Sequence, residues 1–256
     1  MKTIVITGAS SGIGNALAKH LASLKYNVIA TARNKVALEE LQASSPTHIK
    51  IVVGDITTRK IHLEIKEALA NSEQPIILVH NAGIAIPQLF SEMTEELWDQ
   101  HYLINTRSPI FLTKLLLPYL KNGGRVLNIS TGLAHTPMGA MSAYGVSKAA
   151  LFFWKEFCNI ELKNQGISFG SVMPGIVNTD MQARIRASDS EKFPNVDLFK
   201  GFYQRHELLS PQIVAKFLTW LILQADDEAF MKGDWNVYDK FHHIHWASPG
   251  EKIERS

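Results

Sequence analysis

Short runs of apolar and β-branched residues recur along the chain, each about as long as a β-strand. The runs are continuous rather than alternating, which is typical of strands buried on both faces of a parallel sheet. The pattern predicts seven strands: Thr3–Thr7, Asn27–Thr31, Ile49–Val53, Ile76–His80, Arg125–Ile129, Ile167–Met173 and Trp235–Tyr238.

Segments with helical periodicity separate these strands. They predict helices over Gly14–Leu24, Lys35–Ala43, Arg59–Ala70, Glu95–Tyr119, Tyr144–Gln165 and Pro211–Ala225. Alternation of strand and helix indicates an α/β fold: a Rossmann-like, doubly wound sheet of about seven parallel strands with helices on both faces. No linker or repeat divides the chain, so we expect a single domain over residues 1–256.

Two segments interrupt the alternation. Residues 181–209, from Met181 to Leu209, carry aromatic and arginine side chains without a clean period, and we expect an irregular loop that covers the substrate. The tail, about residues 239–256, contains His242, His243 and His245. Metal binding by this His-x-His pattern is the minor alternative. The main interpretation is a tail packed on the surface or on a neighbour, with no metal site.

Composition excludes several classes of protein. Of 256 residues, 46% are hydrophobic and 20% are charged, so the chain is neither disordered nor collagen-like. The net charge of +2 predicts no nucleic acid and no membrane surface as partner. The single cysteine, Cys158, cannot form an intrachain disulfide. No signal-peptide pattern or membrane-spanning run is found, and we expect a soluble, cytoplasmic protein.

A glycine-rich turn, Thr7–Gly14, lies between the first predicted strand and the first helix. Such a turn lets backbone N–H groups approach a pyrophosphate at the positive end of the helix. No lysine follows Gly14, which argues against a P-loop kinase or GTPase. The residues of this turn that we expect to bind the cofactor are Gly8, Ser10, Gly12, Ile13 and Gly14.

The end of the second strand indicates which dinucleotide binds. NAD sites place an acidic residue there, whereas NADP sites offer an arginine to the 2′-phosphate. Arg33 occupies this place, and the first acidic residue of the chain is Glu39. The alternative is that Arg33 is an ordinary solvated turn residue. We predict NADP as cofactor, with NADPH preferred over NADH.

Tyr144 and Lys148 stand four residues apart in a predicted helix, so they lie on one face of it. A free tyrosine has a pKa near 10 and is a poor acid–base catalyst at neutral pH. We expect the Lys148 ammonium to lower the pKa of Tyr144 toward the working range.

From Thr3 to about Tyr238 the sequence closely resembles the short-chain dehydrogenase/reductase family. His80 departs from the family pattern by replacing an asparagine that often precedes the N-A-G turn. The matching segments are Thr7–Gly14, Asp55, Asn81-Ala82-Gly83, Asn105, Asn128–Thr131, Tyr144, Lys148 and Pro174–Thr179.

The resemblance implies reversible hydride transfer between NADP(H) and a carbonyl or alcohol. Tyr144 would exchange a proton with the substrate oxygen, and Lys148 would bind the nicotinamide ribose. Asn105 would hold a water that relays protons to Lys148. A hydroxyl thirteen positions before the tyrosine would polarise the carbonyl. That count favours Thr131 over the neighbouring Ser130.

The resemblance also implies further cofactor contacts. Asp55 would hold the adenine, Asn81 would contact the cofactor from the N-A-G turn, and Pro174, Ile176 and Thr179 would receive the nicotinamide. A rival hypothesis is a sensor or regulatory protein that binds NADP(H) but is catalytically silent. Retention of both Tyr144 and Lys148 argues against it.

Substrate and assembly are less directly encoded. Pocket candidates are Ile84, Ile86, His135, Met138, Met141 and the aromatic residues of 181–209. They predict a small, fairly apolar carbonyl or alcohol. Arg184 or Arg186 could instead receive an acidic group. The helix Tyr144–Gln165 is apolar on more than one face, which favours a homodimer or homotetramer.

Overall fold

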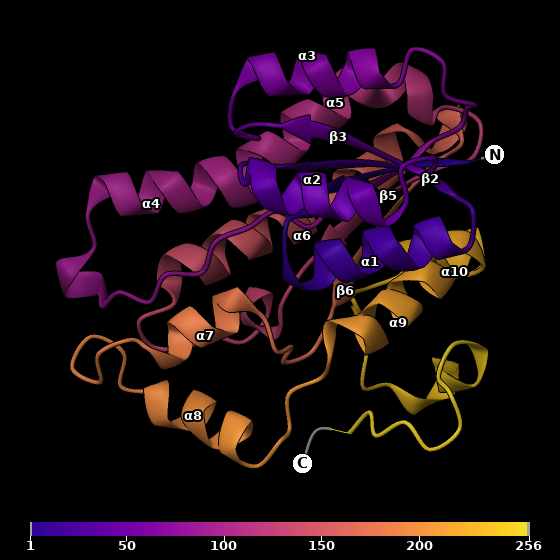
Figure 1. Cartoon of the computed structure of the whole chain (residues 1–256). Coiled ribbons are helices and arrows are strands. Elements are labelled where there is room, and N and C mark those ends of the chain that lie inside the picture. Colours follow the sequence, from indigo (N-terminus) through magenta and orange to yellow (C-terminus); the bar gives the residue numbers. More distant parts are fainter. Residues whose placement is uncertain (1, 255–256) are drawn as a thin grey trace.

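The structure is a computed structural model that describes residues 2–254. Seven parallel strands form one sheet in the order β3-β2-β1-β4-β5-β6-β7 (Figure 1). The predicted fold class is confirmed. The strands are β1 (Thr3–Thr7), β2 (Asn27–Ala32), β3 (Ile49–Val53), β4 (Ile77–His80), β5 (Gly124–Ile129), β6 (Ile167–Met173) and β7 (Trp235–Asn236).

The chain reverses its direction of travel across the sheet between β1 and β4, which are neighbours although two strands separate them in sequence. In open α/β sheets, ligands bind at the carboxyl ends of the strands beside such a reversal. The residues that follow β1, β4 and β5 are therefore the ones best placed to form a site.

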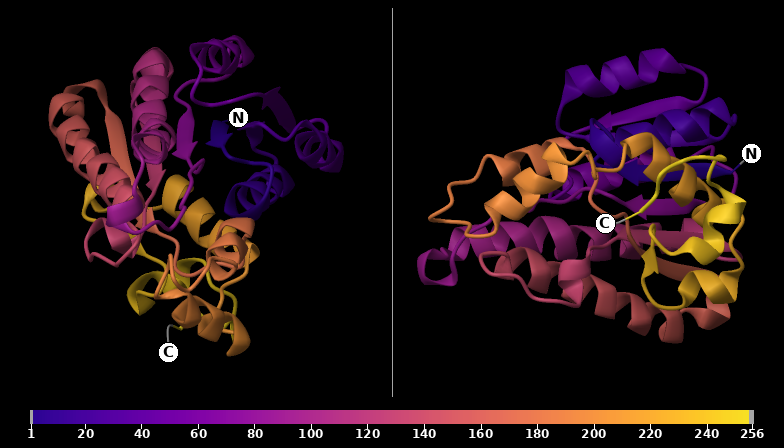
Figure 2. Two further views of the ribbon diagram at one scale, coloured as in Figure 1. Left: turned by 90° about the vertical axis from the view of Figure 1, so that its left-hand side faces the viewer. Right: turned by 90° about the horizontal axis from the view of Figure 1, so that it is seen from below.

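Helices cover both faces of the sheet (Figure 2). On one face, α1 (Gly12–Ser23), α2 (Lys35–Ser44) and α9 (Pro211–Leu223) bury residues such as Leu17 and Phe217 against the strands. On the other face, α3 (Arg59–Ala68), α5 (Ser108–Leu120) and α6 (Ser142–Glu161) form a second apolar layer. Burial of both strand faces accounts for the continuous apolar runs in the sequence.

The predicted helix Glu95–Tyr119 occupies its expected place but is not uniform. It consists of α4 (Glu95–Tyr102), a π-helical turn (Leu103–Arg107) and α5. The π turn contains Asn105 and Thr106, both of them buried. Such turns are frequent at functional sites.

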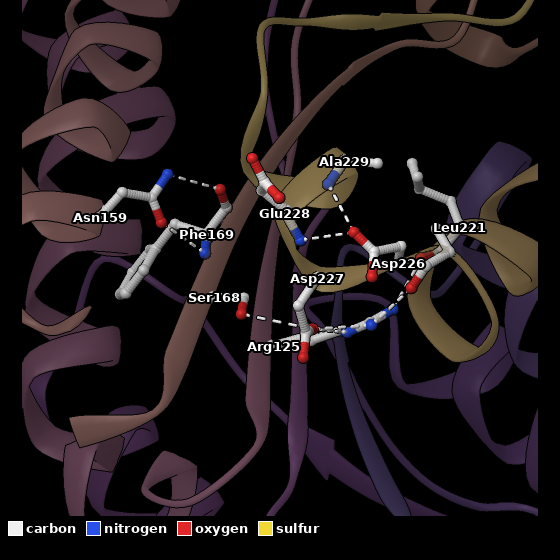
Figure 3. Close-up of polar contacts among 10 residues, drawn as sticks. Arg125, Asn159, Ser168, Phe169, Leu221, Asp226, Asp227, Glu228 and Ala229 are labelled. Carbon is white, nitrogen blue, oxygen red and sulfur yellow. Dashed lines mark hydrogen bonds and ion pairs between the residues drawn. The ribbon is translucent and has the colours of Figure 1, made fainter. Parts of the chain in front are cut away.

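Arg125 of β5 links the sheet to neighbouring helices at the strand ends opposite the site (Figure 3). Its guanidinium donates to Leu221 O at 3.1 Å, to Ala225 O at 2.6 Å and to Asp227 Oδ1 at 2.7 Å. These bonds join β5 to the end of α9 and to a short helix, α10 (Asp227–Met231). The short helix α10 lies outside the helices predicted from the sequence.

The segment 181–209 is not irregular, which corrects our prediction. It contains α7 (Asp180–Arg186) and α8 (Val196–Gln204). The Thr179 hydroxyl caps α7 by accepting from Gln182 N, as N-cap residues do. On α8, Val196 and Phe202 are buried. These two apolar positions are six residues apart and stand among charged residues, so the helix was not recognised from the sequence.

The C-terminal tail packs against α9. The buried His242 ring stacks on Phe217 at 4.7 Å, donates from Nε2 to Asn236 O, and accepts at Nδ1 from Trp246. Within residues 2–254 there is no group of three His, Cys, Asp or Glu side chains arranged to hold a metal ion. No helix in this described part is long and apolar enough to cross a membrane.

Candidate active site

The glycine-rich turn leaves β1 and enters α1 with an unusual backbone. Gly8 and Gly12 have φ angles of +68° and +54°, which residues with a side chain rarely adopt. A Cβ atom on Gly14 would lie 2.5 Å from Asn81 Nδ2 and from Gly8 O. The first turn of α1 holds no acidic residue. The positive dipole end of α1, without an acidic side chain nearby in the helix, fits a pyrophosphate. The other predicted contacts in the turn are Ser10 and Ile13.

Asn81 holds this turn in place from the end of β4. Its Nδ2 donates to Thr7 O at 2.9 Å and to Gly8 O at 3.0 Å. The Thr7 hydroxyl accepts in return from the N–H groups of Asn81 and Ala82. Both amide hydrogens of Asn81 are thus used inside the protein. Asn81 therefore holds the shape of the turn through bonds within the protein.

Arg33 and Asp55 follow the ends of the neighbouring strands β2 and β3. Arg33 is exposed directly after β2, and Asp55 follows β3, where Gly54 N donates to Ala32 O at 2.9 Å. The Asp55 carboxylate accepts at Oδ1 from the N–H and hydroxyl of Thr57. The structure thus brings a guanidinium and an oriented carboxylate to the same edge as the glycine turn.

Tyr144 lies in the first turn of α6, beside the end of β5. Its phenol forms a hydrogen bond with the side chain of Thr131, whose Oγ1 also accepts from Leu133 N at 3.3 Å. The neighbouring Ser130 hydroxyl is buried and has no hydrogen-bond partner among residues 2–254. Successive side chains of an extended segment point to opposite sides, so only one of these two hydroxyls reaches the tyrosine.

Lys148 is buried one helical turn beyond Tyr144. Its Nζ donates to Ile129 O at 2.7 Å. A Cβ on Gly83 would lie 3.6 Å from this Nζ and 3.1 Å from Asn105 Oδ1. The glycine of the N-A-G turn therefore leaves the space that the lysine and the asparagine share.

The protonation of this pair differs from our expectation. Burial raises the pKa of Tyr144 to about 12, and the hydrogen bond from Thr131 opposes that rise only in part. Burial lowers the pKa of Lys148 to about 8, against an opposing effect of the Asp234 charge. The net shift of the Tyr144 pKa is therefore upward, opposite to our expectation, because desolvation outweighs the hydrogen bond with Thr131.

Asn105 projects from the π turn and is fully buried. Its Oδ1 accepts from Ile84 N at 2.9 Å, while Nδ2 donates to Ile84 O and to Ser147 Oγ. Both amide hydrogens are taken by protein groups. A water in the expected relay would therefore be held as a donor to an oxygen of Asn105, not as an acceptor from its amide.

The segment Pro174–Thr179 follows β6 and bends at Gly175, whose φ is +79°. Ile176 N donates to Tyr238 Oη at 3.0 Å, and Ile176 O accepts from Leu209 N at 2.9 Å. A Cβ on Gly12 would lie 3.0 Å from Thr179 Cγ2. This segment therefore closes over the glycine turn.

The helices α7 and α8 form an apolar cover over Tyr144. Buried Ile185, Phe193 and Val196 cluster with Ala85 and Met141. Partly buried side chains that pack on this cluster include Leu89, Leu133, Met138, Tyr144, Met181 and Phe199.

Other residues that were predicted to line the pocket lie outside this apolar cluster. His135 Nε2 pairs with Asp234 Oδ2 at 2.9 Å. Ile86 is largely exposed, and Arg184 is exposed. Arg186 bonds to Gln182 and covers the Tyr203 ring at 4.2 Å. Neither arginine belongs to the apolar cluster.

Comparison with known proteins agrees with this geometry. The profile of the short chain dehydrogenase family matches residues 2–190. The chain belongs to the short-chain dehydrogenase/reductase family.

Relatives of this short-chain dehydrogenase cover most of its length. An uncharacterised oxidoreductase of Saccharomyces cerevisiae is 32% identical over 88% of this chain and 91% of its own. The benzil reductase ((S)-benzoin forming) of Bacillus cereus is 29% identical over 91% and 98%. The crystal structure of the KRED1-Pglu enzyme matches with a TM-score of 0.85 at 31% identity, covering 91% of this chain and 100% of the other.

Three residues that border the short-chain dehydrogenase site escaped the sequence analysis. Tyr238 holds the Pro174–Thr179 segment, Asp234 acts on Lys148, and Gly83 leaves room beside it. The glycine was visible in the N-A-G turn. The other two are brought to the site by β7, whose only pairing partner in the described chain is β6. No local pattern marks either of them.

Proposed function

We propose that this short-chain dehydrogenase reduces small, apolar carbonyl compounds with NADPH, with Tyr144 as the proton donor. The observation that carries the proposal is the Thr131–Tyr144 hydrogen bond, located one helical turn from Lys148 and beside the glycine turn. The proposed acid Tyr144, the polarising hydroxyl of Thr131 and the cation Lys148 lie at the strand ends where a doubly wound sheet binds its ligands.

The cofactor would be held along the strand ends. Gly8, Gly12 and Gly14 would admit the pyrophosphate at the start of α1, and Arg33 would bind the 2′-phosphate as a planar guanidinium. Asp55 would receive the adenine. When bound, NADPH supplies the hydride. The absence of acidic residues before Glu39 favours the phosphorylated cofactor.

The protein's own contribution is to place and supply a proton. A phenol with a pKa raised to about 12 is protonated at neutral pH, which is the state that a proton donor requires. Thr131 orients that phenol and can donate a second hydrogen bond to the substrate oxygen. Lys148 and Asn105, which share the space beside Gly83, form the route by which Tyr144 would regain its proton.

The cover formed by α7 and α8 supports an apolar substrate. Its cluster over Tyr144 contains Phe193, Ile185 and Met141, and shape rather than charge would select the ligand. Two relatives are benzil reductases, at 29% and 27% identity, and another is an L-xylulose reductase at 35% identity. An aromatic diketone fits this cluster better than a polyhydroxylated sugar, which would leave its hydroxyls without partners.

The test is NADPH oxidation with benzil and L-xylulose as paired substrates. We expect turnover of benzil, little or none of L-xylulose, and loss of benzil turnover in Tyr144→Phe. Efficient use of L-xylulose alone would contradict the apolar pocket. Absence of turnover over a wider carbonyl panel, with NADPH still bound, would favour a silent NADPH-binding protein.

A second copy of the chain is the proposed partner of α6. Phe153 and Ile160 are 61% and 78% exposed, and the exposed Phe157 packs edge-on against Phe153. Phe111 of α5 is also exposed. Large apolar side chains that are exposed together indicate an interface. Light scattering during gel filtration should give a dimer or tetramer, and Phe153→Glu should dissociate it.

A further inference from the structure

His135 and Asp234 form a bridge across α6. Asp234 lies directly before β7, its side chain is 4% exposed, and its Oδ2 is 2.9 Å from His135 Nε2. The His135 ring packs edge-on against Phe152 of α6, with 4.7 Å between centroids. The loop that begins with Thr131 is thereby joined to the start of β7. A carboxylate is thus held inside the protein beside α6.

The strand register places Asp234 in a row of polar residues. Asn128 of β5 pairs with Ser171 of β6, and Trp235 of β7 pairs with Val172. Asp234 is therefore level with Ser171, two strands away from Asn128. Paired residues in neighbouring strands point to the same face, which here is the face of Phe169 that α5 and α6 cover.

The polar atoms of this row are unsatisfied. Asn128 Nδ2 and Oδ1, Ser171 Oγ and Asp234 Oδ1 are buried and have no hydrogen-bond partner in the described chain. Buried polar groups are almost always paired or hydrated, so such a row does not belong to an ordinary apolar core. It begins beside Ile129, whose carbonyl accepts from Lys148 Nζ. By register, Asn128 and Ser171 therefore lie between the end of β5 that Lys148 contacts and Asp234.

Few charged groups face Lys148. Tyr144 lies on its own helix and His80 faces it from β4, with His62 of α3 beyond His80. Burial raises the pKa of Tyr144 to about 12 and lowers the pKa of His80 to about 3, so both are uncharged at neutral pH. Asp234 is the carboxylate whose charge acts on Lys148.

The buried Lys155 nearby does not compete for Asp234. It pairs with Glu156 at 2.8 Å and donates to Met231 O and Gly233 O. Lys155 therefore has an ion-pair partner and backbone acceptors other than Asp234.

We propose that Asp234, held by His135, is a positioning residue that lies across the buried polar row from Lys148, serves as its counter-charge and sets the protonation of the Tyr144–Lys148 pair. This inference rests on the proposed function for its catalytic consequence, but the electrostatic relationship exists in the protein alone.

The consequence has a definite sign and size. Removing a negative charge favours loss of a proton from both members of a coupled pair, so both apparent pKa values fall. Two strand spacings separate Asp234 from β5 by about 10 Å. Coulomb's law with an effective dielectric constant of about 20 then gives a shift of about one pH unit.

The decisive experiment is an NMR titration of lysine labelled with ¹³C at Cε in the ligand-free protein, with the Lys148 signal assigned by Lys148→Arg. The variant Asp234→Asn keeps an acceptor oxygen for His135 and removes only the charge. We expect the Lys148 pKa to fall by about one pH unit. The control Asp239→Asn removes an exposed carboxylate five residues further on and should leave the pKa unchanged.

An unchanged Lys148 pKa in Asp234→Asn would overturn the proposal, even if the enzyme is fully active. If Asp234→Asn fails to fold, Asp234→Ser removes the same charge and should lower the Lys148 pKa in the same direction. If Asp234→Ser leaves the Lys148 pKa unchanged, the proposal is wrong. In the active enzyme, the pH profile of kcat/KM should move to lower pH by a similar amount. A shifted titration with no turnover of any carbonyl would contradict the proposed function and leave the electrostatic inference standing.

Discussion

The side chain of Thr131 is hydrogen-bonded to the phenol of Tyr144, whereas the adjacent hydroxyl of Ser130 is buried without a partner in the described part of the chain. The two hydroxyls follow β5 in sequence and differ by one position in register. This relationship assigns the polarising role in the proposed reaction to Thr131, and the register can be tested directly.

Thr131→Ala should lower kcat for carbonyl reduction by about 10²–10³, as loss of one donor to a developing oxyanion does. Thr131→Ser keeps the hydroxyl and should stay within several-fold of wild type. Ser130→Ala is the matched control and should have a mild effect. A reversed order, with Ser130→Ala crippled and Thr131→Ala tolerated, would exchange the two roles.

Tyr144→Phe removes the proposed proton donor while leaving the glycine turn and Lys148 in place. Proton donation contributes about 10²–10⁴ to the rate, and kcat should fall by that factor. The dissociation constant for NADPH, measured by fluorescence titration, should change little. Tyr26→Phe makes the same chemical change far from the site and should behave as wild type. Near-normal turnover by Tyr144→Phe would remove the acid–base role.

Arg33→Ala should reduce the preference for NADPH over NADH by about 10- to 100-fold, the equivalent of one hydrogen-bonded charge pair. The measurement is kcat/KM for both cofactors with one substrate. NADH serves as the internal control, because it lacks the phosphate and should be used equally well by both proteins. A wild type that favours NADH, or an unchanged ratio in the variant, would contradict the assignment.

Buried histidines should make the fold sensitive to acid. His80 is bonded to Thr113 Oγ1 at 2.7 Å, and burial lowers its pKa to about 3 from about 6.5 in the unfolded chain. Because the folded pKa is depressed, the unfolded state binds the proton more readily as pH falls below about 6.5. The free energy of unfolding should therefore fall by about 2 kcal/mol between pH 8 and pH 5 on account of His80 alone.

Urea denaturation of wild type and His80→Asn at both pH values checks this prediction. The variant introduces the asparagine that the family often has at this position and should lose less stability on acidification, whatever its stability at pH 8. The buried His242 has a pKa lowered mainly by burial and should remain as a source of acid sensitivity in both proteins. Equal losses of unfolding free energy in the two proteins between pH 8 and pH 5 would show that His80 does not contribute to the acid sensitivity.

The sequence by itself determined the sheet, the glycine turn and the Tyr144–Lys148 pair, because these depend on local patterns. Continuous apolar runs specify strands buried on both faces, and a spacing of four places two side chains on one helix face. The order of the motifs along the chain then indicated the family, which the comparison confirmed.

Tertiary structure alone decided the surroundings of those residues. The pKa of Tyr144 depends on how deeply α7 and α8 bury it, and the sequence analysis expected the opposite direction of shift. Asp234 and Tyr238 reach the site through the pairing of β7 with β6. Desolvation and contacts between distant segments depend on three-dimensional packing, which no spacing along the chain encodes.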